Sequence, residues 1–161
     1  GLGDVYKRQL YNIASVLINP GDEVILPCPY WVSYADIVKL KGGVPVEVKT
    51  DIKNNFKMTG DQLINAITEK TKMVWFSSPC NPSGSVYSKK ELQEISNVLE
   101  SHKGIFIVSD EIYEHINYKG GHHSIGSFEN VKDRTITVNG VSKAFAMTGW
   151  RIGYILSLIH I

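Results

Sequence analysis

The stretch Met73–Asp110, MVWFSSPCNPSGSVYSKKELQEISNVLESHKGIFIVSD, decides the fold class. Its two near-continuous apolar runs, Met73–Ser77 and Ile105–Ser109, are typical of strands that are covered on both faces. Between them, Ser88-Lys89-Lys90-Glu91 fits a capping box, in which two side chains satisfy backbone donors at the start of a helix. That helix is expected to run through His102, with one apolar stripe formed by Leu92, Ile95, Val98 and Leu99. A strand, a capped helix and a strand form a βαβ unit, which predicts a parallel sheet.

Helical and strand patterns alternate on both sides of this unit. Further helices are expected over Leu10–Ile18, over Trp31–Lys41, and from the second capping box at Thr59-Gly60-Asp61-Gln62 through Ile67. The remaining expected strands are Glu23–Leu26, Val44–Val48, Thr135–Val138 and Arg151–Leu156. The fold class that follows is α/β, a three-layer α/β/α sandwich with a mostly parallel sheet.

Composition excludes several classes of protein. The 161 residues correspond to about one domain, and 43% hydrophobic with 20% charged residues is too apolar for disorder. Lys and Arg total 17 against 16 Asp and Glu, so the net charge of +1 gives no reason to expect a nucleic acid partner. No apolar run approaches the roughly 18 residues that a membrane span needs. Cys28 and Cys80 lack metal-site spacing, which favours two buried thiols in a reducing cytoplasm.

The two ends of the chain fit poorly with what they flank. The opening GLGDVYKRQ and the closing LSLIHI resemble translated sequencing-adapter read-through. We therefore expect residues 1–9 and 156–161 to be non-native sequence, and residues 10–155 to be a segment of a longer protein.

Polar residues follow the ends of the three strongest strands. Asn81 lies in the loop after the first strand, Asp110 and Tyr113 end the second, and Lys143 follows the third, with Arg151 eight residues further on. Because ligands of such sheets bind beyond the carboxyl ends of the strands, these side chains are expected to converge.

The chemistry of these groups points to one cofactor. A partly desolvated Lys143 amine can condense with an aldehyde, and a buried Asp110 carboxylate can keep a pyridine nitrogen protonated. An Asn amide and a Tyr hydroxyl can bind a phenolate oxygen, and an Arg can form two parallel bonds to a phosphate. The aromatic face of Trp31 can stack on a planar ring. Together these groups predict pyridoxal 5′-phosphate.

Four motifs in order make the chain resemble a known family. Ser142–Gly153, SKAFAMTGWRIG, is similar throughout to the lysine signature of the class I aminotransferases of fold type I, particularly the aspartate aminotransferase-like subgroup. The other motifs are Ser78–Gly84, Ser109–Glu114 and Pro29–Trp31. The resemblance spans Leu10 to about Ile155, and it identifies this segment as the central part of the large cofactor-binding domain, less than half of a full-length member.

The resemblance implies an enzyme that moves an amino group between an amino acid, aspartate or similar, and a 2-oxo acid. Lys143 would be the catalytic residue and would carry the cofactor. The other implied cofactor-binding residues are Asp110, Tyr113, Asn81, Arg151, Trp31 and Ser142. Trp31 and Asn81 would also contact substrate. The full-length protein would be a cytoplasmic homodimer.

The sequence also departs from the family. Val5-Tyr6-Lys7-Arg8-Gln9 stands where the family has a Gly-Ala phosphate-binding turn before the first helix. The substrate-carboxylate arginine, the substrate-contacting N-terminal segment and groups from a second subunit fall outside the chain. We therefore expect the chain as given to be catalytically inactive.

Two other functions remain open on the sequence alone. A relative with the same fold and cofactor could catalyse β-elimination as a carbon–sulfur lyase, or the domain could be a non-enzymatic regulator that binds the cofactor. No metal site is expected: His115, His122 and His123 could join Glu111, but a solvated loop near Gly120-Gly121 is the simpler interpretation.

Overall fold

The computed structural model describes residues 6–118 and 120–157, and its centre is a six-stranded sheet in the order β2-β1-β3-β4-β5-β6. The strands are β1 (Glu23–Cys28), β2 (Val44–Lys49), β3 (Thr71–Ser77), β4 (Phe106–Asp110), β5 (Thr135–Gly140) and β6 (Gly153–Leu156). The pairs from β2 through β5 are parallel, and β6 runs antiparallel to β5. The mostly parallel sheet predicted from the sequence is confirmed.

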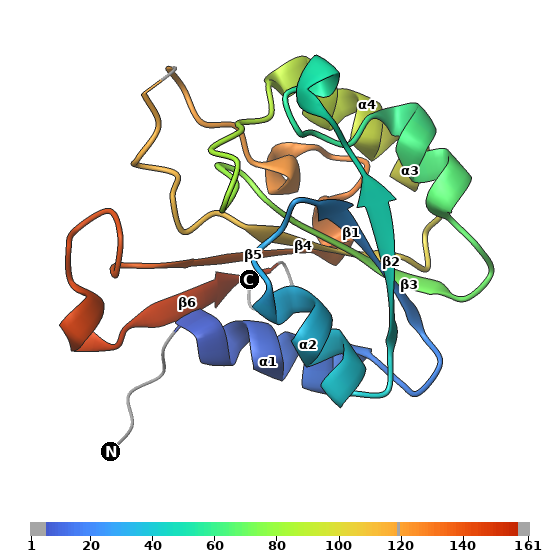
Figure 1. Cartoon of the computed structure of the whole chain (residues 1–161), viewed down its shortest axis with the longest axis horizontal. Coiled ribbons are helices and arrows are strands. Elements are labelled where there is room, and N and C mark those ends of the chain that lie inside the picture. Colours follow the sequence, from blue (N-terminus) through green and yellow to red (C-terminus); the bar gives the residue numbers. More distant parts are fainter. Residues whose placement is uncertain (1–5, 119, 158–161) are drawn as a thin grey trace.

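Helices cover both faces of this sheet. They are α1 (Tyr6–Leu17), α2 (Ser33–Leu40), α3 (Gly60–Ala66) and α4 (Lys89–Glu100). Figure 1 shows α1 and α2 on one face and α3 and α4 on the other. The predicted three-layer α/β/α sandwich is therefore confirmed. Among the described residues, none of the helices is long and apolar enough to cross a membrane.

Each face of the sheet has its own hydrophobic core, because side chains along a strand point alternately to the two faces. Val24, Leu26 and Trp75 are buried with residues of α1 and α2, such as Leu10 and Tyr34. The other core, on the α3 and α4 side, includes Ile25, Val74, Phe76, Leu63, Leu92 and Ile95. Because successive strand residues point to opposite faces, the same strands supply both cores.

Both predicted capping boxes are present. The Ser88 hydroxyl accepts from the Glu91 N–H at 3.3 Å, and the Glu91 carboxylate accepts from the Ser88 N–H at 2.7 Å. Thr59 and Gln62 form the matching pair at the start of α3. Each box satisfies backbone donors that a helix N-terminus otherwise leaves unpaired.

The structure differs from the sequence-based expectation at the start of α1 and at the two cysteines. Helix α1 begins at Tyr6 rather than at Leu10, because Tyr6 and Leu10 lie one helical turn apart and are buried on the same face. Cys28 and Cys80 are only half-buried, so the expectation of two buried thiols was wrong. Cys28 is the last residue of β1, and Cys80 lies in the loop that follows β3. Of the end segments expected to be non-native, residues 1–5 and 158–161 lie outside the described part of the chain.

Candidate active site

Three parallel strands end side by side at one edge of the sheet. Ser77, the last residue of β3, pairs with Asp110, the last residue of β4, and Asp110 pairs in turn with Val138 of β5. The loops that leave these strands therefore start next to one another. This register brings together the segments that carry the predicted site residues.

Asp110 is buried at the centre of this edge, with 1% of its surface exposed. Its Oδ2 accepts a hydrogen bond of 2.6 Å from the Tyr34 hydroxyl, and its Oδ1 accepts one of 3.3 Å from the Ile112 N–H. Burial raises the pKa of Asp110 to about 6, and the two hydrogen bonds oppose that rise. The carboxyl group is thus held in a fixed position and titrates near neutrality.

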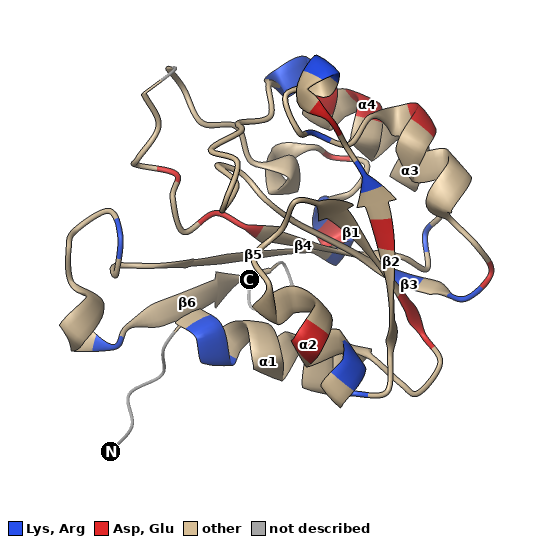
Figure 2. Cartoon of the chain, in the orientation of Figure 1, with Lys and Arg blue, Asp and Glu red and all other residues tan. Residues whose placement is uncertain are grey.

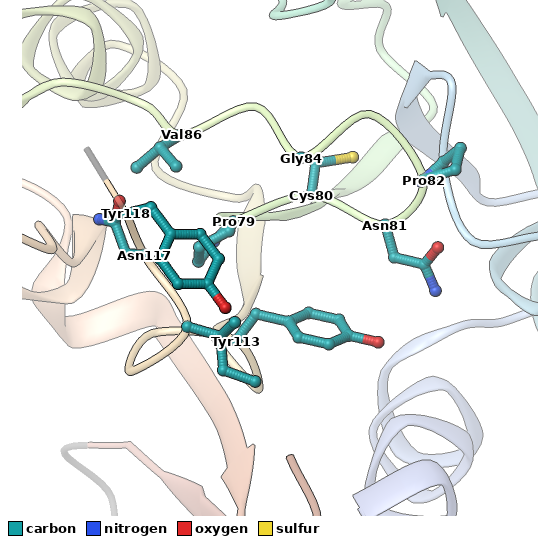
Figure 3. A pocket seen from close by; sticks show the side chains of 10 residues that line it. Pro79, Cys80, Asn81, Pro82, Gly84, Val86, Tyr113, Asn117 and Tyr118 are labelled. Carbon is teal, nitrogen blue, oxygen red and sulfur yellow. The ribbon is translucent and has the colours of Figure 1, made fainter. Parts of the chain in front are cut away.

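Asn81 and Tyr113 line a common cavity of about 340 Å³. Figure 3 shows the Asn81 amide and the Tyr113 phenol extending toward the same side of this pocket. Burial and the nearby Asp110 charge raise the pKa of Tyr113, so its hydroxyl is protonated at neutral pH. The cavity therefore offers an amide and a phenol as hydrogen-bond donors.

A second cavity, of about 110 Å³, is lined by the basic side chains of the site. Its lining consists of Tyr6, Lys7, Ser142, Lys143, Thr148 and Arg151. Figure 2 shows basic residues at the start of α1 and in the loop between β5 and β6, on the same side of the molecule. Three cationic side chains and three hydroxyl-bearing residues around one small cavity are suited to bind a phosphate group.

Lys143 lines the smaller cavity, and Tyr113 lines the larger one. Lys143 is exposed, so the expectation of a partly desolvated amine was wrong for this chain. The Lys143 Nζ is 5.9 Å from the centroid of the Tyr113 ring. The loop that carries Lys143 is held in place because the Thr148 hydroxyl donates to the Ser142 carbonyl at 2.9 Å. The Arg151 guanidinium donates to the Thr148 carbonyl at 3.1 Å.

Trp31 joins the site from the α2 side. It is half-buried and meets the Tyr34 ring edge-on at 5.6 Å, and Tyr34 in turn binds Asp110. All seven residues that the sequence singled out are therefore connected around one sheet edge.

Two residues at this edge were missed by the sequence reasoning. Tyr34 was expected only on the apolar face of a helix, yet its hydroxyl binds a carboxylate 76 positions away. Tyr6 was set aside with the chain end, yet it is buried beside Trp31, with a centroid separation of 6.3 Å. The helical spacing from Tyr6 to Leu10 was the available signal that Tyr6 belongs to α1.

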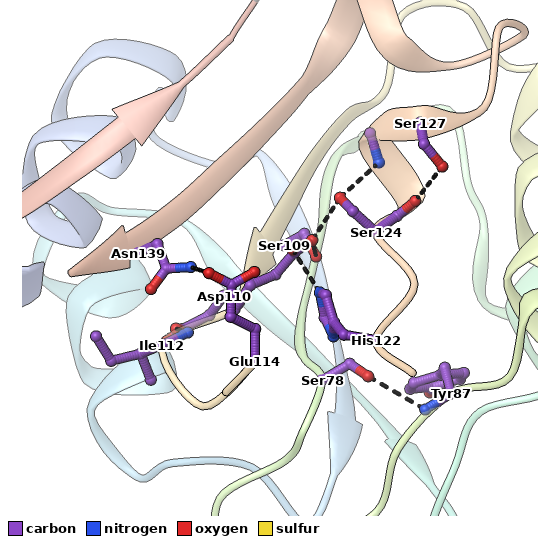
Figure 4. A network of polar contacts seen from close by, with 12 residues as sticks. Ser78, Tyr87, Ser109, Asp110, Ile112, Glu114, His122, Ser124, Ser127 and Asn139 are labelled. Carbon is purple, nitrogen blue, oxygen red and sulfur yellow. Dashed lines mark hydrogen bonds and ion pairs between the residues drawn. The ribbon is translucent and has the colours of Figure 1, made fainter. Parts of the chain in front are cut away.

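A polar network that includes Ser109, His122 and Ser124 lies behind the site (Figure 4). All three side chains bind the buried carboxylate of Glu111. Its carboxylate accepts from Ser109 at 2.8 Å, from Ser124 at 2.6 Å and from the His122 ring at 2.7 Å. The expectation that His122 is solvated was wrong, because this bond draws its loop onto β4. The bond to Glu111 also raises the pKa of His122. His115 and His123 are exposed, as expected.

The ligand atoms of Glu111, Glu114 and His122 all lie within 4.8 Å of one another. The Glu111 and Glu114 carboxylates are already engaged by protein donors, since Glu114 accepts from the Asn139 amide at 2.8 Å. The network therefore connects the loop after β4 to strand β5 through hydrogen bonds.

A family comparison agrees with this geometry. The family model described as aminotransferase class I and II matches residues 6–159. An aspartate aminotransferase of Bacillus sp. (strain YM-2) is 54% identical over 151 residues, which are 92% of this chain and 38% of that protein. An aspartate/prephenate aminotransferase of Nitrosomonas europaea is 50% identical over the same shares.

Solved structures agree as well. The aspartate aminotransferase from Rhizobium meliloti superposes with a TM-score of 0.93 at 43% identity, over 96% of this chain and 39% of that one. The Thermus thermophilus aspartate aminotransferase with maleate gives a TM-score of 0.90 at 45% identity, over 97% and 40%. The chain thus spans about two-fifths of the length of these relatives.

Proposed function

This chain belongs to the class I and II aminotransferases, and on that premise we propose that the protein is a pyridoxal-phosphate-dependent aminotransferase. It moves an amino group between an amino acid, aspartate or similar, and a 2-oxo acid. The observation that carries the proposal is the convergence of Lys143 with a buried carboxyl group and a cationic cavity at one sheet edge. We expect the complete enzyme to be a cytoplasmic homodimer.

The donor set at this edge fits the cofactor chemically. A carboxyl group that is buried and held by a tyrosine suits a protonated pyridine nitrogen, which supplies the positive partner that Asp110 lacks. The cavity lined by Lys7, Lys143 and Arg151 suits a phosphate. The one group that conflicts with the fit is the buried ring of Tyr6.

Each residue has a distinct part in holding the cofactor. Asp110 would bind the pyridine nitrogen, and Asn81 and Tyr113 would donate to the ring oxygen. Ser142 and Arg151 would bind the phosphate. Trp31 would stack on the ring and, with Asn81, contact the substrate.

Lys143 is the residue that acts on the reacting atoms. When bound, the cofactor supplies an electron sink that makes the Cα proton of an amino acid acidic. The Lys143 amine would be the base that takes this proton from Cα and passes it to a carbon of the cofactor. The Lys143 Nζ lies 5.9 Å from the centroid of the Tyr113 ring, which lines the larger cavity.

The proposal can be tested in a chimera. Residues 10–155 of this chain replace the matching segment of the Bacillus sp. (strain YM-2) enzyme, which supplies the rest of the protein. We expect amino transfer from aspartate to a 2-oxo acid, measured by the formation of the product amino acid. Lys143→Ala in the chimera should lower the rate at least 10²–10⁴-fold, the usual range for loss of a general base.

Two results would count against the proposal. A folded chimera that keeps its full rate after Lys143→Ala would exclude Lys143 as the catalytic base. Turnover that needs no 2-oxo acid and releases ammonia would support β-elimination instead.

A further inference from the structure

We infer that the side chain of Tyr6 fills the place of the cofactor ring, so that this chain takes up pyridoxal phosphate only when that side chain is removed. The inference rests on the proposed function, since it concerns the same site. Tyr6 lies within residues 1–9, which the sequence predicts to be non-native, so the inference concerns the chain as given.

The neighbours of Tyr6 carry the inference. Its ring is tilted by 30° against Trp31 at 6.3 Å, and it lines the small cavity together with Ser142, Lys143 and Arg151. Burial, followed by the Asp110 and Tyr113 charges, raises the pKa of the Tyr6 phenol. Four of the seven residues proposed to hold the cofactor thus pack on Tyr6 or line the same cavity with it: Trp31, Ser142, Lys143 and Arg151.

The chemistry of the phenol matches the space that it occupies. A phenol and a pyridine are six-membered aromatic rings of the same size, so the Tyr6 ring beside Trp31 can fill the space that a cofactor ring would need. Tyr6 is only 9% exposed, so its ring is inside the site rather than across its mouth. Two rings cannot share this volume, because protein interiors are close-packed.

The backbone of Tyr6 cannot easily retreat from this position. A Cβ on Gly153 would lie 2.4 Å from both the Cα and the N of Tyr6, which shows how closely β6 approaches the start of α1. Tyr6 also lies one turn from Leu10, which is fully buried. Entry of the cofactor would therefore require the Tyr6 side chain to rotate out and leave the core.

The test measures attachment of the cofactor, not activity. The 161-residue chain and its Tyr6→Ala variant are incubated with pyridoxal phosphate and then with borohydride. The aldehyde condenses with an amine and loses water, and hydride from the borohydride makes the new bond permanent. Peptide masses then locate the labelled lysine.

We expect Tyr6→Ala to label Lys143 at a cofactor concentration at least about tenfold lower than the unchanged chain requires. Tyr6→Phe keeps the ring and should label as poorly as the unchanged chain. Leu10→Ala also removes a buried side chain from α1 but lines neither cavity, so it should not improve labelling. Tyr6→Leu is a second variant without the ring. It keeps an apolar side chain, so it can be measured even if Tyr6→Ala does not fold, and it should also label more readily than the unchanged chain.

A second measurement locates the vacated space. Cavities left by a removed aromatic side chain bind small aromatic molecules. We therefore expect p-cresol to raise the Tm of Tyr6→Ala and to slow the labelling of its Lys143, with no effect on the unchanged chain.

Three outcomes would overturn the inference. Equal labelling of Lys143 in the unchanged chain and in both ring-removing variants would show that Tyr6 does not obstruct the site. Labelling of Tyr6→Ala that p-cresol does not slow would place the cofactor ring elsewhere. Absence of Lys143 labelling in every variant, while the chimera of residues 10–155 is active, would show that more than Tyr6 blocks this chain. An inactive chimera would instead count against the proposed function, because it does not contain Tyr6.

Discussion

Asp110 experiences two opposing effects in the folded chain. Burial favours its neutral form, while the hydrogen bonds from Tyr34 and Ile112 favour its charged form. Burial prevails, and the pKa of about 6 lies above the ordinary value of 3.8. Ionising Asp110 in the folded protein therefore costs stability unless a positive partner is bound.

Because the pKa of Asp110 is raised in the folded chain, the stability of the chain should depend on pH. Between pH 3.8 and about 6 the folded chain binds more protons than the unfolded chain, so the free energy of unfolding falls as pH rises through this window and stays low above it. Asp110→Asn cannot ionise, so it should stabilise the chain by about 2–3 kcal/mol more at pH 7.5 than at pH 4. Urea unfolding at the two pH values measures the difference.

A matched control is Asp133→Asn, at an exposed position in the short 3-10 helix Lys132–Arg134. It should change the free energy of unfolding by less than about 0.5 kcal/mol at either pH. A gain from Asp110→Asn that is equal at pH 4 and pH 7.5 would contradict the assignment of a raised pKa to Asp110.

Single residues were predictable from the sequence only where a strand end fixes their place. Asp110 and Asn81 follow strongly apolar runs, so their position at the sheet edge could be inferred. The bonds from Tyr34 to Asp110 and from His122 to Glu111 join segments with no local pattern in common. Only the assembled tertiary structure brings such groups together, which is why the burial of His122 was missed.

Among the elements, α4 is the one that the sequence defined best. Both halves of its capping box lie within four consecutive residues, so the start of the helix depends on local chemistry alone. The start of α1 was missed because residues 1–9 were expected to be non-native, whereas Tyr6 packs against Trp31 and lies close to Gly153.

Ser88→Ala should therefore weaken α4. Loss of an N-cap hydroxyl typically costs about 1 kcal/mol, within a range of roughly 0.5–2 kcal/mol. Ser101→Ala, at the other end of the same helix, should cost less than about 0.5 kcal/mol, since no cap bond from its side chain is present among the described residues. Chemical unfolding compares the two variants, and equal losses would contradict the role of the cap.

The contact between α1 and β6 leads to another prediction. Gly153→Ala would place a Cβ 2.4 Å from the Tyr6 backbone, so it should cost about 1–3 kcal/mol or more through overpacking. Gly149→Ala has no atom within 4 Å of its new Cβ and serves as the control. Thermal unfolding should separate the two variants, and a tolerated Gly153→Ala would show that α1 and β6 are farther apart.

For the whole molecule, the layers were predictable but the order of strands was not. The continuous apolar runs of β3 and β4 require cover on both faces, and this alone implies helices above and below the sheet. The position of β2 at one edge and the antiparallel direction of β6 depend on pairing between distant segments. The pattern of residues within one strand does not indicate which other strand pairs with it.

The two cores share their strands, so the molecule should unfold as one unit. Leu10→Ala in one core and Leu92→Ala in the other should each cost about 2–5 kcal/mol. Circular dichroism and tryptophan fluorescence, which includes the buried Trp75, should report the same midpoint in each variant. Midpoints that differ between the two probes would contradict a single cooperative unit.

The central claim is that residues from three strand ends form one cofactor site around Lys143. The most direct test is a crystal structure of the chimera that carries residues 10–155, grown with pyridoxal phosphate. We expect density that joins the cofactor to the Lys143 Nζ, with the pyridine nitrogen facing Asp110. Attachment to a different lysine, or a ring nitrogen turned away from Asp110, would contradict it.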